Sequence, residues 1–444
     1  MRSKVHDAIV AGPRAYPQGL RTLAARSLDA LLILWLFLSN GALLPLLVSE
    51  PGSTEMSDGA KGLLRFLVLP SFALAALLVA LRPRAMLAAL VRHPLLTLLL
   101  VWVWCSLAWS LDPSVSLRRA SALTAYTLIA CWLAIGYEPV ALLRRLTGVL
   151  LAQLLLSLAF AAALPALAFM PDDHLLRGIF LHKNVLGQVV VFAAILLLLG
   201  WQFRAIPRFV AGLGLGLVAT MAAMTGSATA LLLIGLVAGV QLLPAILARP
   251  PREAAATLLL LMAAAMFALL GGILLIDEAM ALLGRDFTLT GRTQLWALAV
   301  SMIQERPLLG YGYAVFFDLP SVAYYVEEAL RWKIPNAHSG FLEVALGLGL
   351  PGAALVTFML LAGLARALRT LGAARHGDPA VSYAAAFSLL YLLAYSARNL
   401  VESDLVSQSQ MSWVLAVVAL LLPTVLTRAP GLGPPFLAPG LWRR

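Results

Sequence analysis

The chain has 444 residues, of which 61% are hydrophobic and only 12% are charged. Soluble domains carry about 25% charged residues, so this composition excludes an ordinary soluble domain and predicts a protein embedded in lipid. The formal net charge of +11 suits either a nucleic-acid-binding protein or a membrane protein with basic cytoplasmic loops.

Apolar segments long enough to cross a hydrocarbon core of about 30 Å recur along the whole sequence. The first begins near Leu28, is too long for the apolar region of a signal peptide and has no small-residue cleavage site after it, so we expect no cleaved signal. The sequence predicts an all-α polytopic membrane protein of about twelve transmembrane helices: 28–48, 63–81, 95–110, 120–136, 147–169, 185–200, 207–224, 228–247, 254–276, 340–364, 380–397 and 411–427.

The distribution of Lys and Arg predicts the orientation of these helices. With the N-terminus in the cytoplasm, cytoplasmic segments hold 20 of the 32 basic residues and the other side holds 12, five of them in one long loop, 277–339. The excess of Lys and Arg in the short cytoplasmic loops follows the positive-inside rule. We therefore expect a cytoplasmic segment 1–27, a transmembrane catalytic domain 28–427 that includes the loop, and a cytoplasmic tail 428–444. The partners expected are membrane lipids and not nucleic acid.

Four polar clusters are predicted on the non-cytoplasmic side, and the first leads into the helix near 185. It contains Arg177, His182, Lys183 and Asn184. A helix N-terminus already favours an anion, and these side chains add cationic groups and hydrogen-bond donors there. Snorkelling to the interface would explain Lys183 alone.

The second cluster is the hydroxyl-rich turn Thr225-Gly-Ser227-Ala-Thr229. Turn chemistry and function explain it equally well. The fourth cluster, between the last two helices, is Arg398-Asn399-Leu-Val-Glu402-Ser403-Asp404. The two acids either orient a cation or balance nearby positive charge, and the sequence leaves both interpretations open.

The third cluster is the loop 277–339 itself, which is too long to be a simple connection. It begins with Arg285 and Arg292 and continues into an amphipathic helix that Pro307 ends. Tyr311, between two glycines, offers an aromatic surface suited to a sugar ring. A second helix is expected from Ser321, and the loop ends on Asn336-Ala-His338-Ser-Gly, at the start of the helix near 340.

Cationic residues from separate segments on one side of a membrane predict a site for a multivalent anion such as pyrophosphate, because Arg binds phosphate oxygens in bidentate fashion. No Walker-type loop is present and ATP is absent outside the cytoplasm, so the energy must arrive with the substrate. A sugar on a polyprenyl pyrophosphate meets that requirement. His338, at a helix N-terminus among cations, is the candidate base, since both features favour its neutral form. The alternative is a histidine that only caps the helix.

Asp172-Asp173-His174 is the one candidate for a metal site. Adjacent carboxylates point in different directions in most backbones, and no third acid lies close in sequence. We therefore predict a solvated loop and no metal site. Cys105 and Cys131 lie within predicted helices and lack the spacing of metal ligands.

With these residues in view, the chain resembles the O-antigen ligase and O-antigen polymerase superfamily of bacterial envelopes. The similarity covers roughly residues 177–404 and rests on four stretches: 177–187, with its His-Lys-Asn; 284–296 followed by 306–312; 336–352, which contains His338; and Asn399 with Glu402. The family often has Ser-Arg after its seventh helix, where this chain has Ser227-Ala228.

The resemblance implies a GT-C-like glycosyltransferase of the bacterial inner membrane, an O-antigen ligase that needs no metal, ATP or other cofactor. Its donor would be a glycan on undecaprenyl pyrophosphate, its acceptor lipid A–core, and its site periplasmic, with inversion at the anomeric carbon. By this analogy the basic clusters hold pyrophosphate and His338 activates the acceptor. O-antigen polymerases and protein O-oligosaccharyltransferases share the motifs. A lipid-linked glycan transporter would instead need polar residues at mid-membrane, and the predicted spans are nearly free of them.

Overall fold

The computed structural model describes residues 18–48, 58–247, 289–320, 336–374, 378–408 and 410–426, with the isolated positions 253, 322 and 328. Within these residues the secondary structure is helical, apart from one isolated antiparallel bridge between Phe169 and Leu176. The predicted all-α fold is confirmed.

Most of the predicted spans coincide with helices: α2 (Gln18–Leu38), α3 (Leu44–Val48), α4 (Asp58–Leu81), α5 (Pro83–Arg92), α6 (Pro94–Cys105), α7 (Pro113–Gly136), α8 (Pro139–Ala163), α9 (Pro165–Ala168), α10 (Lys183–Gln202), α11 (Arg208–Thr225), α12 (Ala228–Leu247), α14 (Leu289–Glu305), α16 (Gly340–Ala374), α17 (Pro379–Arg398) and α18 (Met411–Leu426). Six of the described helices (α7, α8, α10, α11, α16 and α17) are long and apolar enough to cross a membrane, or seven spans if the pair α4 and α5, bent by 98°, is one. The chain is thus a multi-pass membrane protein, but the count of twelve is not confirmed. The predicted span 254–276 lies outside the described residues.

Two predicted segments differ from the structure. The expected span 28–48 is broken after Leu38, because the chain turns through Gly41 (φ 75°) while Asn40 and Gln153 exchange side-chain hydrogen bonds of 3.2 and 2.9 Å. The expected loop 82–94 is helix α5, whose Ala85, Met86 and Ala89 are buried.

Several helices begin earlier than the hydropathy of the sequence predicts. α7 and α8 begin at Pro113 and Pro139, ahead of the expected 120 and 147. In each case the preceding acid, Asp112 or Glu138, accepts hydrogen bonds from two backbone N–H groups of the first turn. An acidic N-cap followed by proline is a strong helix start. The arginine pairs in the second turns had kept these helix starts out of the predicted apolar spans.

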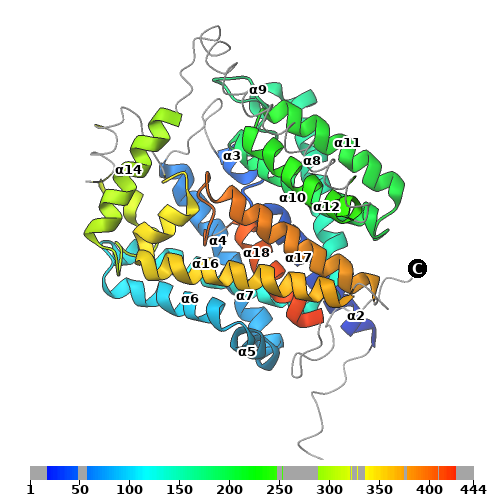
Figure 1. Ribbon diagram of the computed structural model, residues 1–444, viewed down its shortest axis with the longest axis horizontal. Helices are drawn as coiled ribbons and strands as arrows, with labels where there is room; N and C mark the ends of the chain where they lie inside the picture. The colour runs from blue at the N-terminus through cyan, green and yellow to red at the C-terminus, as the bar shows by residue number, and fades with distance from the viewer. Residues whose placement is uncertain are drawn as a thin grey trace, which may run out of the picture.

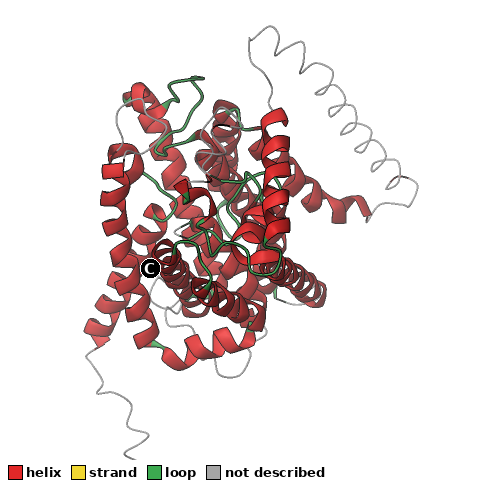
Figure 2. Ribbon diagram, turned by 90° about the vertical axis from the view of Figure 1, so that its left-hand side faces the viewer, coloured by secondary structure: helices red, strands yellow, loops and turns green. Residues whose placement is uncertain are grey.

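The helices form one bundle with α18 at its centre, where residues 411–423 are all buried. α16 and α17 lie side by side and run in opposite directions (Figure 1). We call the end where α16 begins and α17 finishes the site end; it is on the left in Figure 1, where α14 lies across it. Figure 2 looks onto this end and shows loops gathered between the helices.

A kink in α16 anchors part of the long loop to the bundle. Gly349 has φ 72° and ψ 177° and precedes Pro351, so the regular helical bonds are interrupted there. The loop replaces them: the N–H groups of Tyr311 and Gly312 donate to the carbonyls of Leu346 and Gly347 at 2.8 and 3.0 Å. Two of the sequence motifs therefore bind each other through their backbones.

Helix α14 occupies the part of the loop where the sequence predicted an amphipathic helix. Leu295, Ala299 and Ile303 are buried, whereas Val300 is exposed. The second helix expected from Ser321, with a Glu327–Arg331 pair, lies outside the described residues apart from isolated positions.

Candidate active site

The polar clusters that the sequence places in four separate segments meet at the site end. A narrow pocket there has about 200 Å³ of space, part of it open to solvent. Three clusters contribute to its wall: Asn184, Gly187, Gln188 and Val191 from α10; Ser227, Thr229, Ala230 and Leu233 from the turn before α12 and α12 itself; and Arg398 with Glu402. The fourth, around His338, is bonded to the segment 399–403, as described below.

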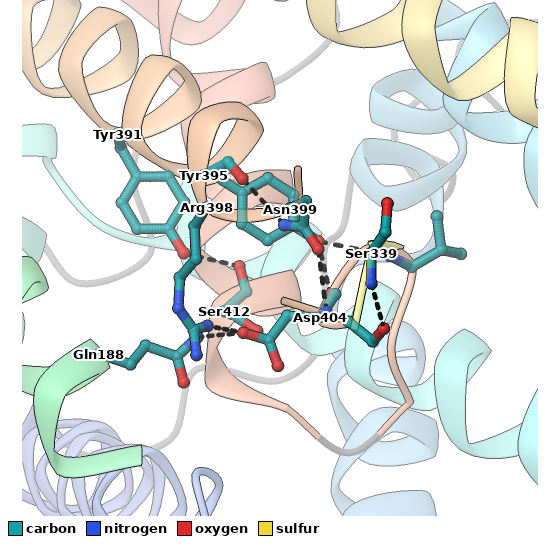
Figure 3. Close-up of polar contacts among 10 residues, drawn as sticks. Gln188, Ser339, Tyr391, Tyr395, Arg398, Asn399, Asp404 and Ser412 are labelled. Carbon is teal, nitrogen blue, oxygen red and sulfur yellow. Dashed lines mark hydrogen bonds and ion pairs between the residues drawn. The ribbon is translucent and has the colours of Figure 1, made fainter. Parts of the chain in front are cut away.

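A buried ion pair organises the wall of this pocket (Figure 3). The guanidinium of Arg398, in the last turn of α17, pairs with the carboxylate of Asp404, and the Gln188 amide donates to the same carboxylate oxygen at 3.0 Å. The Tyr395 hydroxyl donates to the Asp404 carbonyl at 2.9 Å. Asp404, one of the two acids whose role the sequence left open, thus pairs with Arg398.

Asn399 connects this wall to the loop that carries His338. Its buried side chain donates to the Tyr395 carbonyl and accepts from the Asp404 N–H, both at 2.9 Å, and its own carbonyl accepts the Gly340 N–H at 2.9 Å. The Ser403 hydroxyl accepts the Ser339 N–H at 3.0 Å. Asn399 therefore acts as a structural link between the last cluster and the start of α16.

His338 lies in a tightly held and strained turn. Its φ is +47°, a left-handed conformation that costs a residue with a Cβ about 1–3 kcal/mol and persists only where the surroundings impose it. The side chain of Asn336 accepts the His338 N–H at 3.0 Å. The neighbouring Ala337 donates its N–H to Glu343 at 2.8 Å and accepts the Trp296 indole N–H at 3.0 Å.

The cluster at the start of α10 faces the same region. His182 is the N-cap residue, and its Nδ1 accepts the Asn184 N–H at 3.1 Å. Burial lowers the pKa of His182 below its usual 6.5; Lys183 and His338 lower it further, and Glu402 opposes them. His182 is therefore within electrostatic reach of both Glu402 and His338. Lys183 forms an ion pair with Asp173.

Two predicted substrate contacts are turned into the protein. Arg177 is 1% exposed, and its guanidinium donates to the carbonyls of Leu167 and Leu181 at 2.9 and 3.3 Å. Tyr311 is 6% exposed, and its hydroxyl donates to the Met302 carbonyl at 3.0 Å. Both residues hold loops at the site end.

The structure describes only one of the two predicted arginines of the long loop. Arg285 lies outside the described residues. Arg292 belongs to α14, one helical turn before Trp296, whose indole reaches the His338 turn.

The sequence motifs contain both Arg398 and Glu343 but indicate no role in the site for either residue. Arg398 is the one basic residue of its predicted outer loop, a signal that could have found it. Glu343 lies in the first turn of α16, and it binds Ala337 as described above. Within the described residues, no group of three or more His, Cys, Asp or Glu could hold a metal ion.

Residues 213–357 match the model of a protein family described as O-antigen ligase. Over this stretch the chain is similar to the O-antigen ligase family. The match runs from within α11 into α16 and includes His338, Arg292 and Tyr311. It supports the placement in the O-antigen ligase and polymerase superfamily that the motifs indicated.

The chain is also similar to a curated protein over part of its length. Over 291 residues the chain is 26% identical to the exopolysaccharide production protein ExoQ of Rhizobium meliloti, an alignment covering 61% of this chain and 64% of that protein. The chain thus spans less than two thirds of the relative's length. Together the two comparisons support a multi-pass membrane protein of polysaccharide biosynthesis.

Proposed function

We propose that the protein is an O-antigen ligase that transfers a polysaccharide from undecaprenyl pyrophosphate to lipid A–core at the periplasmic face of the bacterial inner membrane. One observation carries the proposal: the strained turn of His338 is bonded to the 399–403 segment, beside a pocket lined by Arg398. His338, the proposed base, and the buried cation Arg398 thus share one end of the bundle. The proposal includes a GT-C-like fold with both termini in the cytoplasm.

In the proposed reaction His338 removes the proton from the acceptor hydroxyl. The hydroxyl oxygen attacks the anomeric carbon from the face opposite the leaving group, so the configuration inverts. The bond from that carbon to the pyrophosphate oxygen breaks, and undecaprenyl pyrophosphate leaves with both electrons. A positioned base contributes about 10²–10⁴-fold, so the remaining rate enhancement must come from binding and from stabilising the leaving group.

The leaving group is a multivalent anion, and we assign its binding to Lys183, Arg285, Arg292 and Arg398. At an effective dielectric constant of about 20, one charge pair at about 4 Å is worth roughly 4 kcal/mol. Two or three such contacts stabilise pyrophosphate without a metal ion or nucleotide.

The other predicted site residues fall into two groups in this proposal. His182, Asn184 and Glu402 line or face the pocket and contact the donor. Arg177, Tyr311, Asn336 and Asn399 make their described hydrogen bonds to protein groups and keep the loops of the site end in place.

O-antigen polymerisation is the second candidate, because the curated relative is named for exopolysaccharide production. The acceptor would then be another lipid-linked glycan. A protein O-oligosaccharyltransferase differs only in accepting a protein hydroxyl, and a lipid-linked glycan transporter would make no new glycosidic bond.

The choice of acceptor is tested with purified protein in liposomes that contain polyprenyl-pyrophosphate glycan, without nucleotide or divalent metal. Lipid A–core, excess lipid-linked glycan and a pilin peptide are supplied separately. Glycan on lipid A–core supports the ligase, and longer lipid-linked chains support the polymerase. Glycan that crosses the bilayer with no new bond overturns both.

A further inference from the structure

A second concave basic site lies at the opposite end of the bundle from His338. An open hollow of about 1070 Å³, part of it solvent, is lined by Arg144, Arg204, Ala205, Ile206, Pro207 and Arg208. α10 begins at the site end and finishes at Gln202, and 20 helical residues span about 30 Å. The three arginines, here called the arginine cradle, are therefore remote from the candidate active site.

Hydrogen bonds hold the backbone of the cradle in a fixed arrangement. The Nε of Arg144, on α8, donates to the carbonyl of Ala205 at 2.6 Å, which ties the turn between α10 and α11 to a third helix. Ala205 is buried, and its N–H donates to the Gly200 carbonyl at 3.0 Å. Arg204 is held at φ +53°. The turn therefore presents its arginines from a defined backbone.

In the part of the chain that the structure describes, no acid balances the positive charge of the cradle. Among the described residues, the guanidinium groups of Arg204 and Arg208 make no hydrogen bond or ion pair, and no acid lines the hollow. Acids on the neighbouring helices are already engaged: Glu138 caps α8 and Asp378 caps α17. Three arginines kept together without a counter-ion match a phosphate group, which Arg binds in bidentate fashion.

The surface beside the cradle is apolar and exposed. Trp201 flanks it, and Phe209 and Leu213 on α11 are 76% and 61% exposed. In a membrane protein such side chains face acyl chains, and tryptophan favours the level of the headgroups. A basic hollow directly above a lipid-facing apolar strip matches a molecule with a phosphate head and hydrocarbon tails, whereas free phosphate would use only the hollow.

We propose that the arginine cradle binds the headgroup of an anionic glycerophospholipid, whose acyl chains lie along Phe209 and Leu213. In the orientation predicted from the sequence this lipid belongs to the cytoplasmic leaflet, where basic pockets between transmembrane helices bind anionic headgroups. The site is independent of the proposed glycosyl transfer.

Native mass spectrometry of the full-length protein in detergent tests this proposal. Phosphatidylglycerol and phosphatidylcholine with identical acyl chains are titrated against the wild type and against the double variant Arg204→Gln/Arg208→Gln. We expect the wild type to bind phosphatidylglycerol about tenfold more tightly than phosphatidylcholine, and the double variant to lose that preference. The variant Arg204→Lys/Arg208→Lys keeps the charge and should keep most of the preference.

The matched control is Arg84→Gln/Arg369→Gln, which removes two exposed arginines from the same end outside the cradle. It should bind phosphatidylglycerol as the wild type does. Equal binding of both lipids by the wild type, an equal loss in the control, or displacement of the lipid by millimolar inorganic phosphate would overturn the proposal. Unchanged melting temperatures exclude misfolding as the cause of a loss.

Discussion

The carboxylate of Glu343 accepts a hydrogen bond of 2.8 Å from the backbone N–H of Ala337, the residue before His338. Glu343 lies in the first turn of α16, and Trp296 holds the other side of the Ala337 peptide by its carbonyl. These contacts, together with the hydrogen bond from the His338 N–H to the Asn336 side chain, hold the turn in its left-handed conformation.

Glu343→Ala should therefore reduce glycan transfer about 10- to 100-fold while leaving His338 present, because a small misplacement of a catalytic group costs about that much. Glu343→Gln keeps an acceptor oxygen and should restore most of the rate. The initial rate of transfer by purified protein measures both. The exposed Glu328, replaced by Ala, is the control; no difference between Glu343→Ala and this control would remove Glu343 from the account.

Gly340 is expected to tolerate no side chain. A Cβ at this position would lie 2.3 Å from Oδ1 of Asn399 and 2.6 Å from Cβ of Leu405, so Gly340→Ala must displace the 399–405 segment from the His338 turn. We expect a lower melting temperature and a large loss of transfer. Gly372→Ala, in the same helix but with no atom within 4 Å of its Cβ, should be neutral or stabilising by about 0.5–1 kcal/mol. Equal behaviour of the two variants would contradict the close packing.

The ion pair between Arg398 and Asp404 should be sensitive to loss of one partner. The side chains are only 8% and 17% exposed, and removing one member of a buried pair costs about 3–5 kcal/mol because the other charge is left uncompensated. Asp404→Asn should therefore lower the melting temperature by several degrees. Asp318→Asn breaks the more exposed pair with Arg119 and should cost no more than about 1 kcal/mol; a comparable loss from this control would argue against the buried pair as the organiser of the pocket.

The stability of the protein should fall in mild acid, in part through His182. Its pKa is lowered in the folded protein, mainly by burial and next by Lys183, so the unfolded chain takes up the proton more readily. This contribution to stability is present above the unfolded pKa of about 6.5 and is lost as the pH falls below it. His182→Asn keeps an N-cap side chain but cannot titrate, so its melting temperature should change less between pH 7.5 and pH 5.5 than that of the wild type. Equal changes would rule out His182 as a source of the dependence.

Hydropathy predicted the helical class and most helix positions, but not the helix starts or the breaks. α7 and α8 begin at acidic caps followed by proline, and the arginine pairs in their second turns exclude these starts from a search for apolar runs. Asn40 interrupts the first predicted span because it finds a partner in Gln153, 113 positions away. Such a long-range partner is not visible in a local window.

In the candidate site, too, local sequence patterns indicated residues but not their long-range contacts. His338 and Asn399 were identified from local patterns, and the structure brings their segments together. The sequence placed Arg177 and Tyr311 among substrate contacts because of their residue types. In the structure Arg177 donates to backbone carbonyls, and the Tyr311 hydroxyl bonds to Met302 and Glu305. Arg398 was named in the fourth cluster without a role, since a single arginine at a helix end resembles an interfacial anchor; its ion pair with Asp404 and its place in the pocket wall come from the structure.

The central claim, that His338 is the base in metal- and nucleotide-free transfer from a lipid-linked pyrophosphate, is tested most directly by His338→Asn in reconstituted liposomes. Asparagine tolerates the left-handed backbone but cannot act as a base, so transfer should fall about 10²–10⁴-fold with an unchanged melting temperature. His174 has the same backbone class, with φ +55°, and His174→Asn should retain wild-type transfer. Wild-type rates in the His338→Asn variant, or transfer by the wild type only after a divalent ion is added, would contradict the account.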